Sequence, residues 1–223
     1  MKAKLFLEAI LKFLLGALLV GLLVFWPAGS FYFLNGWLLL ALLFIPMFIA
    51  GIIMLIKNPE LLKKRLDAKE KQKEQNTVLK LSGLMFILGF VISGLGFRFS
   101  FYTLPNLVVI IATVCFIFAY IIYAEVLREN TYLSRTIEVQ KGQKVIDTGL
   151  YSVVRHPMYS ATLILFLSMP LILGSLYGFL IFLSYPFIIA KRIISEEAFL
   201  EKELDGYKEY KLKVKWRLVP FIW

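Results

Sequence analysis

The chain changes from polar to apolar within one stretch, which reads Gly149-Leu150-Tyr151-Ser152-Val153-Val154-Arg155-His156-Pro157-Met158-Tyr159. Proline favours the first turn of a helix, so Pro157 marks the start of an apolar helix. A second apolar segment follows the turn Leu173-Gly174-Ser175 and leads into the polar sequence Arg192-Ile193-Ile194-Ser195-Glu196-Glu197. These features predict a short helical hairpin over residues 157–190, whose two ends return to the same membrane surface.

The rest of the chain also has the composition of a membrane protein. Of its 223 residues, 60% are hydrophobic, whereas soluble globular chains have about 45–50% apolar residues. A spanning helix needs ~20 mostly apolar residues, and six segments approach this length: Leu7–Trp26, Phe31–Ile56, Thr77–Phe97, Tyr102–Leu127, Pro157–Leu173 and Ser175–Ala190. We therefore predict an all-α integral membrane protein with about six transmembrane helices and a cytoplasmic amphipathic helix after Ala190.

Basic residues lie almost entirely on one side of these predicted spans. Four groups, at the N-terminal end, in 57–80, in 128–155 and after residue 190, hold 3, 8, 5 and 8 of the 25 lysines and arginines. Basic residues accumulate in cytoplasmic loops, so we expect both termini to be cytoplasmic and the protein to lie in the cell membrane. A signal-peptidase site at Ala28-Gly29-Ser30 is the alternative for the first segment, although Phe25-Trp26 favours an interfacial anchor.

The net charge of +10 does not indicate nucleic-acid binding. The lysines and arginines flank apolar runs, which favours anionic lipid headgroups as their partners. With one cysteine and one histidine in the chain, no disulfide and no metal site are expected. Asn58-Pro59-Glu60 has the pattern of a helix start and predicts an amphipathic helix on the inner membrane face, followed by a charged loop. Aromatic residues near the C-terminus suggest a tail folded back onto the bilayer surface.

The predicted hairpin should bring together five polar residues, which are Arg155, His156, Arg192, Glu196 and Glu197. Ionisable groups at the edge of an apolar phase are costly unless they pair or serve a site. The alternative for each residue is a structural one, as a helix cap, a topology anchor or a solvated ion pair. Tyr151 and Tyr159 stand beside this group, and aromatic faces attract cations such as a sulfonium. The combination indicates a site for a zwitterionic or cationic ligand.

The same residues resemble the signature of the isoprenylcysteine carboxyl methyltransferase family, within a wider group of membrane phospholipid methyltransferases. The resemblance is carried by Gly149-Leu150-Tyr151, Arg155-His156-Pro157-Met158-Tyr159, Arg192, Glu196-Glu197, Leu200, Tyr207 and Tyr210. It implies an integral membrane enzyme that uses S-adenosyl-L-methionine, releases S-adenosyl-L-homocysteine and needs no metal. Ala161 departs from the family, which often has glycine at this position.

The resemblance also implies roles for individual residues. It assigns cofactor binding to Gln143, Lys144, Val145, Ile146, Tyr151, His156, Pro157, Met158, Tyr159 and Glu196. Arg155 joins this predicted set for a physical reason, because with the free N–H groups at the start of the helix it would form an anion site. Arg192 matches an arginine near the methyl-accepting group. On this basis residues 1–127 form a four-span membrane region with a basic cytoplasmic loop at 57–76. Residues 128–223 form the catalytic region, with the cofactor loop, the hairpin and the C-terminal helix.

The methyl acceptor is expected to be a hydrophobic or lipid-linked molecule that reaches the site from the bilayer. A carboxylate is ionised at neutral pH and needs only orientation, which Arg192 could supply with two hydrogen bonds. An amine would first have to lose a proton, and Glu197 is then the candidate base. The sequence favours a carboxylate of isoprenylcysteine type. The alternatives are a phospholipid or other amine, a small hydrophobic thiol or acid, a nicotinamide-dependent membrane reductase and a non-enzymatic transporter or scaffold.

Overall fold

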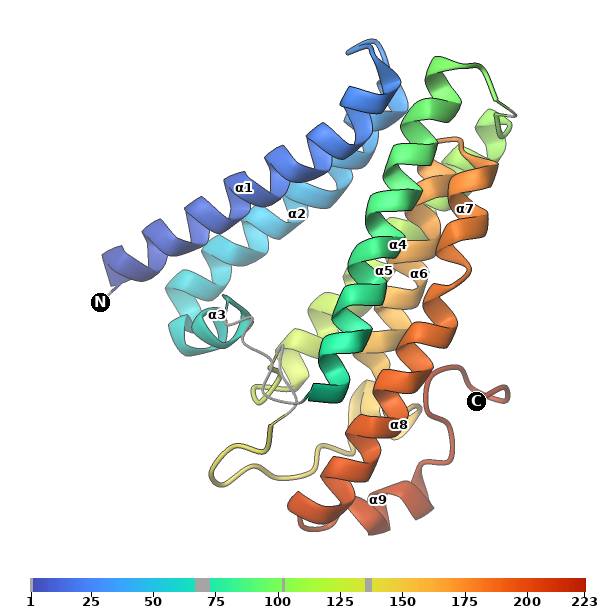
Figure 1. Ribbon diagram of the computed structural model, residues 1–223. Coiled ribbons are helices and arrows are strands. Elements are labelled where there is room, and N and C mark those ends of the chain that lie inside the picture. Colours follow the sequence, from blue (N-terminus) through green and yellow to red (C-terminus); the bar gives the residue numbers. More distant parts are fainter. Residues whose placement is uncertain (1, 67–72, 102, 135–137) are drawn as a thin grey trace.

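The computed structural model describes residues 2–66, 73–101, 103–134 and 138–223, and its regular elements are all helical (Figure 1). The helices are α1 (Lys2–Ala28), α2 (Leu34–Lys57), α3 (Pro59–Leu66), α4 (Lys73–Arg98), α5 (Asn106–Glu129), the 3-10 helix η1 (Gly149–Ser152), α6 (Pro157–Ile172), α7 (Leu176–Phe182), α8 (Tyr185–Glu203) and α9 (Tyr207–Lys213). The predicted all-α class is confirmed.

In the part of the chain that the structure describes, five helical stretches are long and apolar enough to cross a membrane. They are Lys4–Ala28, Leu34–Lys57, Gln75–Arg98, Asn106–Glu129 and Leu176–Glu203, and Pro157–Ile172 is a shorter apolar helix. A helix rises 1.5 Å per residue, so the 16 residues of α6 extend over only ~24 Å, less than the ~30 Å hydrocarbon core of a bilayer. If the end of α6 at Ile172 reaches one surface of the hydrocarbon core, Pro157 at its start therefore lies slightly within the core near the opposite surface.

The predicted hairpin is present, and its turn contains Gly174 as expected. Gly174 has φ +72°, a conformation that glycine adopts without steric strain. Ser175 N–H donates to the Pro170 carbonyl oxygen over 2.9 Å, and the Ser175 hydroxyl accepts a hydrogen bond from Gly178 N–H at the start of α7. These bonds close the turn between α6 and α7.

The second arm of the hairpin differs from the prediction in two ways. It is interrupted between Phe182 and Tyr185, because Pro186 has no N–H to donate to the preceding turn and its ring restricts that turn. It then continues past Ala190 to Glu203, so the predicted boundary between a sixth span and a separate amphipathic helix is wrong. One helix, α8, carries the chain from the apolar segment to the polar region.

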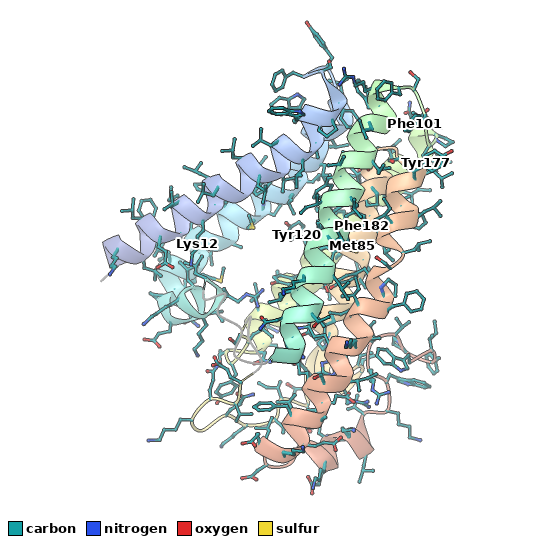
Figure 2. All side chains as sticks on the ribbon, viewed as in Figure 1. Lys12, Met85, Phe101, Tyr120, Tyr177 and Phe182 are labelled. Atoms are coloured by element: carbon teal, nitrogen blue, oxygen red, sulfur yellow. The ribbon has the colours of Figure 1, made fainter. Side chains whose placement is uncertain are left out.

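Close packing around α4 holds the bundle together. Phe182 is fully buried and Met85 is 3% exposed, and Figure 2 shows both side chains between α4 and α7. A Cβ atom on Gly89 would lie 2.2 Å from the Phe182 ring, and one on Gly94 would lie 2.5 Å from the Val24 carbonyl oxygen of α1. Small residues of this kind allow helices in membranes to approach closely.

The predicted amphipathic helix after Asn58 is present as α3 and is attached to three other parts of the chain. Asn58 Oδ1 accepts a hydrogen bond from Leu61 N–H, as expected of an N-cap. Lys12 of α1 donates to the Leu66 carbonyl oxygen over 2.7 Å, and Arg65 donates to the Tyr123 hydroxyl of α5. Lys64 donates to Gln140 in the loop that follows α5. Residues 67–72 of the predicted charged loop lie outside the described residues.

Candidate functional site

The start of α6 is held in place by the segment that follows α9. The backbone N–H groups of Arg155 and His156 donate to the carbonyl oxygens of Trp216 and Arg217, each over 2.9 Å. The Ser160 hydroxyl donates to the Leu218 carbonyl oxygen over 2.5 Å. The tail therefore lies against the turn before the hairpin. The sequence suggested only that the tail folds back onto the bilayer surface.

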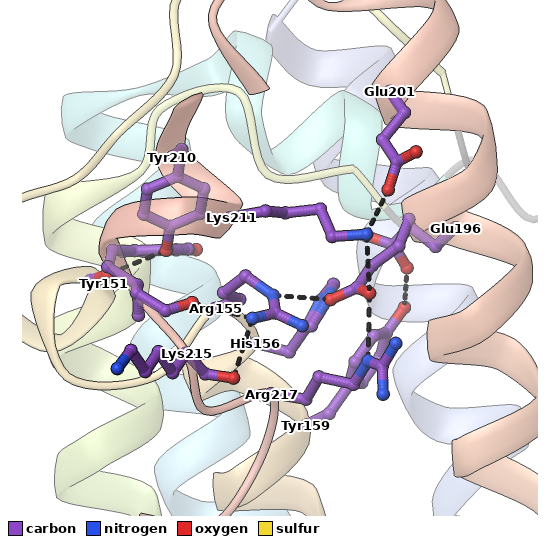
Figure 3. Close-up of polar contacts among 12 residues, drawn as sticks. Tyr151, Arg155, His156, Tyr159, Glu196, Glu201, Tyr210, Lys211, Lys215 and Arg217 are labelled. Atoms are coloured by element: carbon purple, nitrogen blue, oxygen red, sulfur yellow. Dashed lines mark hydrogen bonds and ion pairs between the residues drawn. The ribbon is translucent and has the colours of Figure 1, made fainter. Parts of the chain in front are cut away.

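Glu197 is the centre of a buried ion-pair network beneath this turn. It is 2% exposed. One of its carboxylate oxygens lies 2.7 Å from Arg155 Nε and 3.2 Å from His156 Nε2, and the other lies 2.9 Å from Arg217 Nε (Figure 3). Both oxygens are thus engaged with basic groups. These contacts argue against the role of proton acceptor that the sequence suggested for Glu197, and they favour a structural role.

Arg155 is equally engaged. Its Nη1 donates to the carbonyl oxygens of Val214 and Lys215 over 2.7 and 2.9 Å, while its Nε pairs with Glu197. A guanidinium with all these partners positions the turn between the C-terminal tail and α8. Because Arg155 also lines the cavity described below, its predicted cofactor contact stays a prediction.

A second polar group joins α6 to α8 on the other side of His156. The Tyr159 hydroxyl donates to Glu196 over 2.6 Å and accepts a hydrogen bond from Arg192 Nε over 2.8 Å. The rings of His156 and Tyr159 are stacked, with centroids 5.7 Å apart and an interplanar angle of 24°. Carboxylate, guanidinium and aromatic faces therefore converge at one place, as the sequence predicted for a zwitterionic ligand.

The end of α5 fixes the turn that precedes the hairpin. Glu129 accepts hydrogen bonds from the Thr148 hydroxyl and from Leu150 N–H. Gly149 has φ +48°, and a Cβ atom at this position would lie 2.2 Å from the Glu129 carboxylate. Only glycine fits this turn without displacing the glutamate, which gives a physical reason for glycine in the sequence motif.

Tyr151 connects the same turn to α9. Its hydroxyl accepts a hydrogen bond from Asn130, and its carbonyl oxygen accepts one from the Tyr210 hydroxyl over 2.7 Å. Burial raises the pKa of the Tyr151 hydroxyl to about 12, although the bond from Asn130 acts in the opposite direction. Tyr151 therefore stays neutral at physiological pH.

These elements enclose a cavity between residues 130–134 and 138–146, the start of α6, α8 and α9. Its lining includes every residue that the sequence predicted to bind the cofactor: Gln143, Lys144, Val145, Ile146, Tyr151, Arg155, His156, Pro157, Met158, Tyr159 and Glu196. Arg192 also lines the cavity, whereas Glu197 does not. The structure thus brings the predicted set together, with Glu197 as the exception, and their contacts with a cofactor stay predictions.

Sequence reasoning assigned no role to several other residues at the cavity. The lining also contains Asn130, Tyr132, Leu133, Ser134, Glu138, Leu200, Leu204, Tyr207 and Tyr210. Leu200, Tyr207 and Tyr210 belonged to the resemblance and could have been proposed from it. Arg217 donates a hydrogen bond to Glu197. No sequence pattern indicated this contact, because it depends on the path of the tail.

The comparison with protein families bears on this part of the chain. Residues 107–205 match the family model of phospholipid methyltransferases. The match runs from α5 to the end of α8 and so contains most of the cavity lining. Among curated proteins, no match was found. With the apolar helices, the match indicates an integral membrane methyltransferase, and methyltransferases of that family use S-adenosylmethionine.

The cavity is chemically suited to such a cofactor. The Glu196 carboxylate offers a cation electrostatic attraction, whereas the Tyr159 ring already lies under the Arg192 guanidinium and is stacked with His156. Tyr207 lines the cavity and is 4% exposed, and its hydroxyl has no hydrogen-bond partner among the described residues. Burial, and then the charges of Glu197 and Glu196, raise the pKa of the Tyr207 hydroxyl well above its ordinary value, so it remains a hydrogen-bond donor.

Proposed function

We propose that this protein is an S-adenosylmethionine-dependent methyltransferase whose acceptor is a carboxylate on a lipid-linked molecule of the isoprenylcysteine type. The observation that carries the proposal is the group of Arg192, Tyr159 and Glu196 at one end of the cavity, where α8 leaves its apolar part. A water-soluble donor and a lipid-borne acceptor can both approach such a position.

The residues of this group would divide the work between donor and acceptor. Glu196 would attract the positive end of the donor, while the Arg192 guanidinium would orient the acceptor carboxylate. S-adenosylmethionine supplies the methyl group as a sulfonium. A bond then forms between the methyl carbon and the carboxylate oxygen while the carbon–sulfur bond breaks, and a neutral ester and thioether result. Alignment and the exclusion of water are the enzyme's main contributions.

A carboxylate acceptor is favoured because the methylation of an ionised carboxylate needs no base to remove a proton. The two oxygens of Glu197 are engaged with Arg155, His156 and Arg217, and Glu196 already accepts a hydrogen bond from Tyr159. A protonated amine would need to transfer a proton to a base before attack. Glu197 is not well placed to receive it, and Glu196 would lose the charge that attracts the donor.

Transfer to a phospholipid amine is the second candidate function, and the family match over residues 107–205 favours it. Glu138 lines the cavity and is a further carboxylate there. An amine acceptor would thus require Glu138 or solvent to take the proton. Measuring the products with two acceptors separates the two functions.

Ligand binding is the first test of the proposed function. Calorimetry on the detergent-purified protein should show binding of S-adenosylhomocysteine and no binding of NADPH. Transfer of a labelled methyl group should then be measured with N-acetyl-S-farnesylcysteine and with phosphatidylethanolamine vesicles. Methylation of the farnesylcysteine alone supports the carboxylate proposal, and methylation of the vesicles alone supports the phospholipid amine.

Two other outcomes would remove the proposal. Binding of NADPH without S-adenosylhomocysteine would place the protein among reductases. Binding of neither molecule, in a preparation that unfolds cooperatively on heating, would indicate that the cavity has another ligand.

A further inference from the structure

The hydroxyl of Tyr207 is the most unusual polar group in the cavity. It is shielded from solvent and has no partner in the part of the chain that the structure describes. A buried polar group without a hydrogen bond destabilises a protein, so such groups are rare in the absence of a function. The neighbouring Tyr210 shows the ordinary arrangement, since its hydroxyl donates to the Tyr151 carbonyl oxygen.

The position of Tyr207 along the cavity follows from α8. Arg192, Glu196, Leu200 and Leu204 all line the cavity, and their four-residue spacing places them along one face of the chain. From Arg192 to Leu204 an α-helix advances by ~18 Å. Arg192 is the member nearest the apolar part of α8, and Leu204, its C-cap residue, is the farthest.

The far end of this row is apolar and aromatic. Leu204, Tyr207, Tyr210 and Val214 form a buried cluster against which Val139, Val145 and Leu200 pack. A flat heterocycle with polar edges suits such a wall, because its faces pack on side chains while its edges need hydrogen bonds. The charged Arg192 end suits the reacting groups and lies where a lipid-borne acceptor can arrive.

We propose that the Tyr207 hydroxyl binds the adenosine part of the methyl donor by a hydrogen bond, and thereby orients the donor with its sulfonium toward Arg192. This inference rests on the proposed function. In it, Tyr207 is a positioning residue: it contacts the nucleoside and does not take part in bond making. The opposite orientation would place the sulfonium toward the Leu204 end of the row, away from Arg192.

The test compares ligands that share the nucleoside. Binding of S-adenosylhomocysteine and of 5′-methylthioadenosine, which lacks the amino-acid part, is measured by calorimetry for the wild-type protein and for Tyr207→Phe. The substitution should lower the affinity for both ligands by the same factor, about three- to tenfold for one neutral hydrogen bond. Its ligand-free thermal stability should equal or exceed that of the wild type, because the lost hydroxyl had no partner.

Two other tyrosines serve as controls. Tyr177 of α7 has a half-exposed side chain that contacts Phe101, at the other end of the bundle in Figure 2. Tyr177→Phe should therefore alter neither ligand binding nor thermal stability. Tyr210→Phe removes a partnered hydroxyl and should lower the unfolding temperature.

Each other result would overturn the inference. Wild-type affinity for both ligands in Tyr207→Phe would show that the hydroxyl does not contact the donor. Weaker binding of S-adenosylhomocysteine alone would place Tyr207 at the amino-acid end and reverse the orientation. If the wild-type protein binds neither ligand, the proposed function itself fails and the inference falls with it.

Discussion

Glu196 and Glu197 are adjacent in the sequence but have different partners, and substitution by glutamine should separate their roles. Glu196→Gln keeps the buried ion pairs and should abolish binding of S-adenosylmethionine with no change in unfolding temperature. Glu197→Gln leaves the Arg155 guanidinium buried without a counter-charge. Loss of one partner of such a pair lowers the free energy of unfolding by roughly 3–5 kcal/mol. Thermal unfolding and calorimetry on both variants check this.

The two substitutions control for each other, since both replace a carboxylate by an amide in the same turn of α8. Equal thermal stability in the two variants would contradict the structural role of Glu197. Unchanged cofactor binding in Glu196→Gln would remove Glu196 from the cofactor site.

Arg192→Ala tests the division between donor and acceptor. The substitution removes the guanidinium that bonds to Tyr159 but leaves the bond between Tyr159 and Glu196. We expect the affinity for S-adenosylhomocysteine to change little and kcat to fall on the order of 10²-fold, as when a transition-state donor is removed. Steady-state methyl transfer and calorimetry measure the two quantities. A collapse of cofactor affinity instead would assign Arg192 to the cofactor pocket.

At this scale the sequence predicted which residues meet but not what each one does. The motif residues carried their own signal, because ionisable side chains beside apolar segments are unusual. The roles of Glu197 and Arg155 could not be predicted, since they depend on carbonyl oxygens and on Arg217 from a tail that has no regular structure. An unpartnered hydroxyl such as that of Tyr207 has no counterpart in the sequence.

Among the elements, the tail after α9 is the one whose removal should be most informative. Truncation after Lys213 removes the carbonyl oxygens that bind Arg155 and the acceptors of the Arg155 and His156 N–H groups. We expect the truncated protein to lose binding of S-adenosylhomocysteine although the membrane helices remain. Lys215→Ala is the control, because Lys215 binds Arg155 through its backbone carbonyl, which this substitution keeps. Wild-type binding by the truncated protein would show that the turn before α6 keeps its conformation without the tail.

The elements themselves were largely predictable because apolar length determines a membrane helix. The four long N-terminal helices and the hairpin lie close to their predicted ranges. The interruption at Leu183 and Ser184 was missed although Pro186 indicated it. The continuation of α8 beyond Ala190 was missed because hydropathy marks the end of an apolar segment and not the end of a helix.

For the whole molecule, the distribution of basic residues makes a topological prediction that labelling can check. In a Cys115→Ser background, a cysteine at Tyr32 should react with a membrane-impermeant maleimide in intact cells. Tyr32 is 89% exposed between α1 and α2. A cysteine at Lys141, in the loop that lines the cavity region, should react only after the cells are permeabilised. Labelling of Lys141→Cys in intact cells would contradict the predicted topology and favour the opposite orientation.

The continuity of α8 between the apolar segment and the polar region has a kinetic consequence. If the donor arrives through water and the acceptor through the bilayer, their concentrations are expressed in different units. The donor then acts by its molarity, and the acceptor by its mole fraction among the surrounding lipids. Adding inert lipid at constant volume should slow the reaction, whereas diluting the whole suspension at saturating donor should leave turnover per enzyme unchanged. Such surface dilution would be the behaviour of a catalyst that works at a two-dimensional concentration.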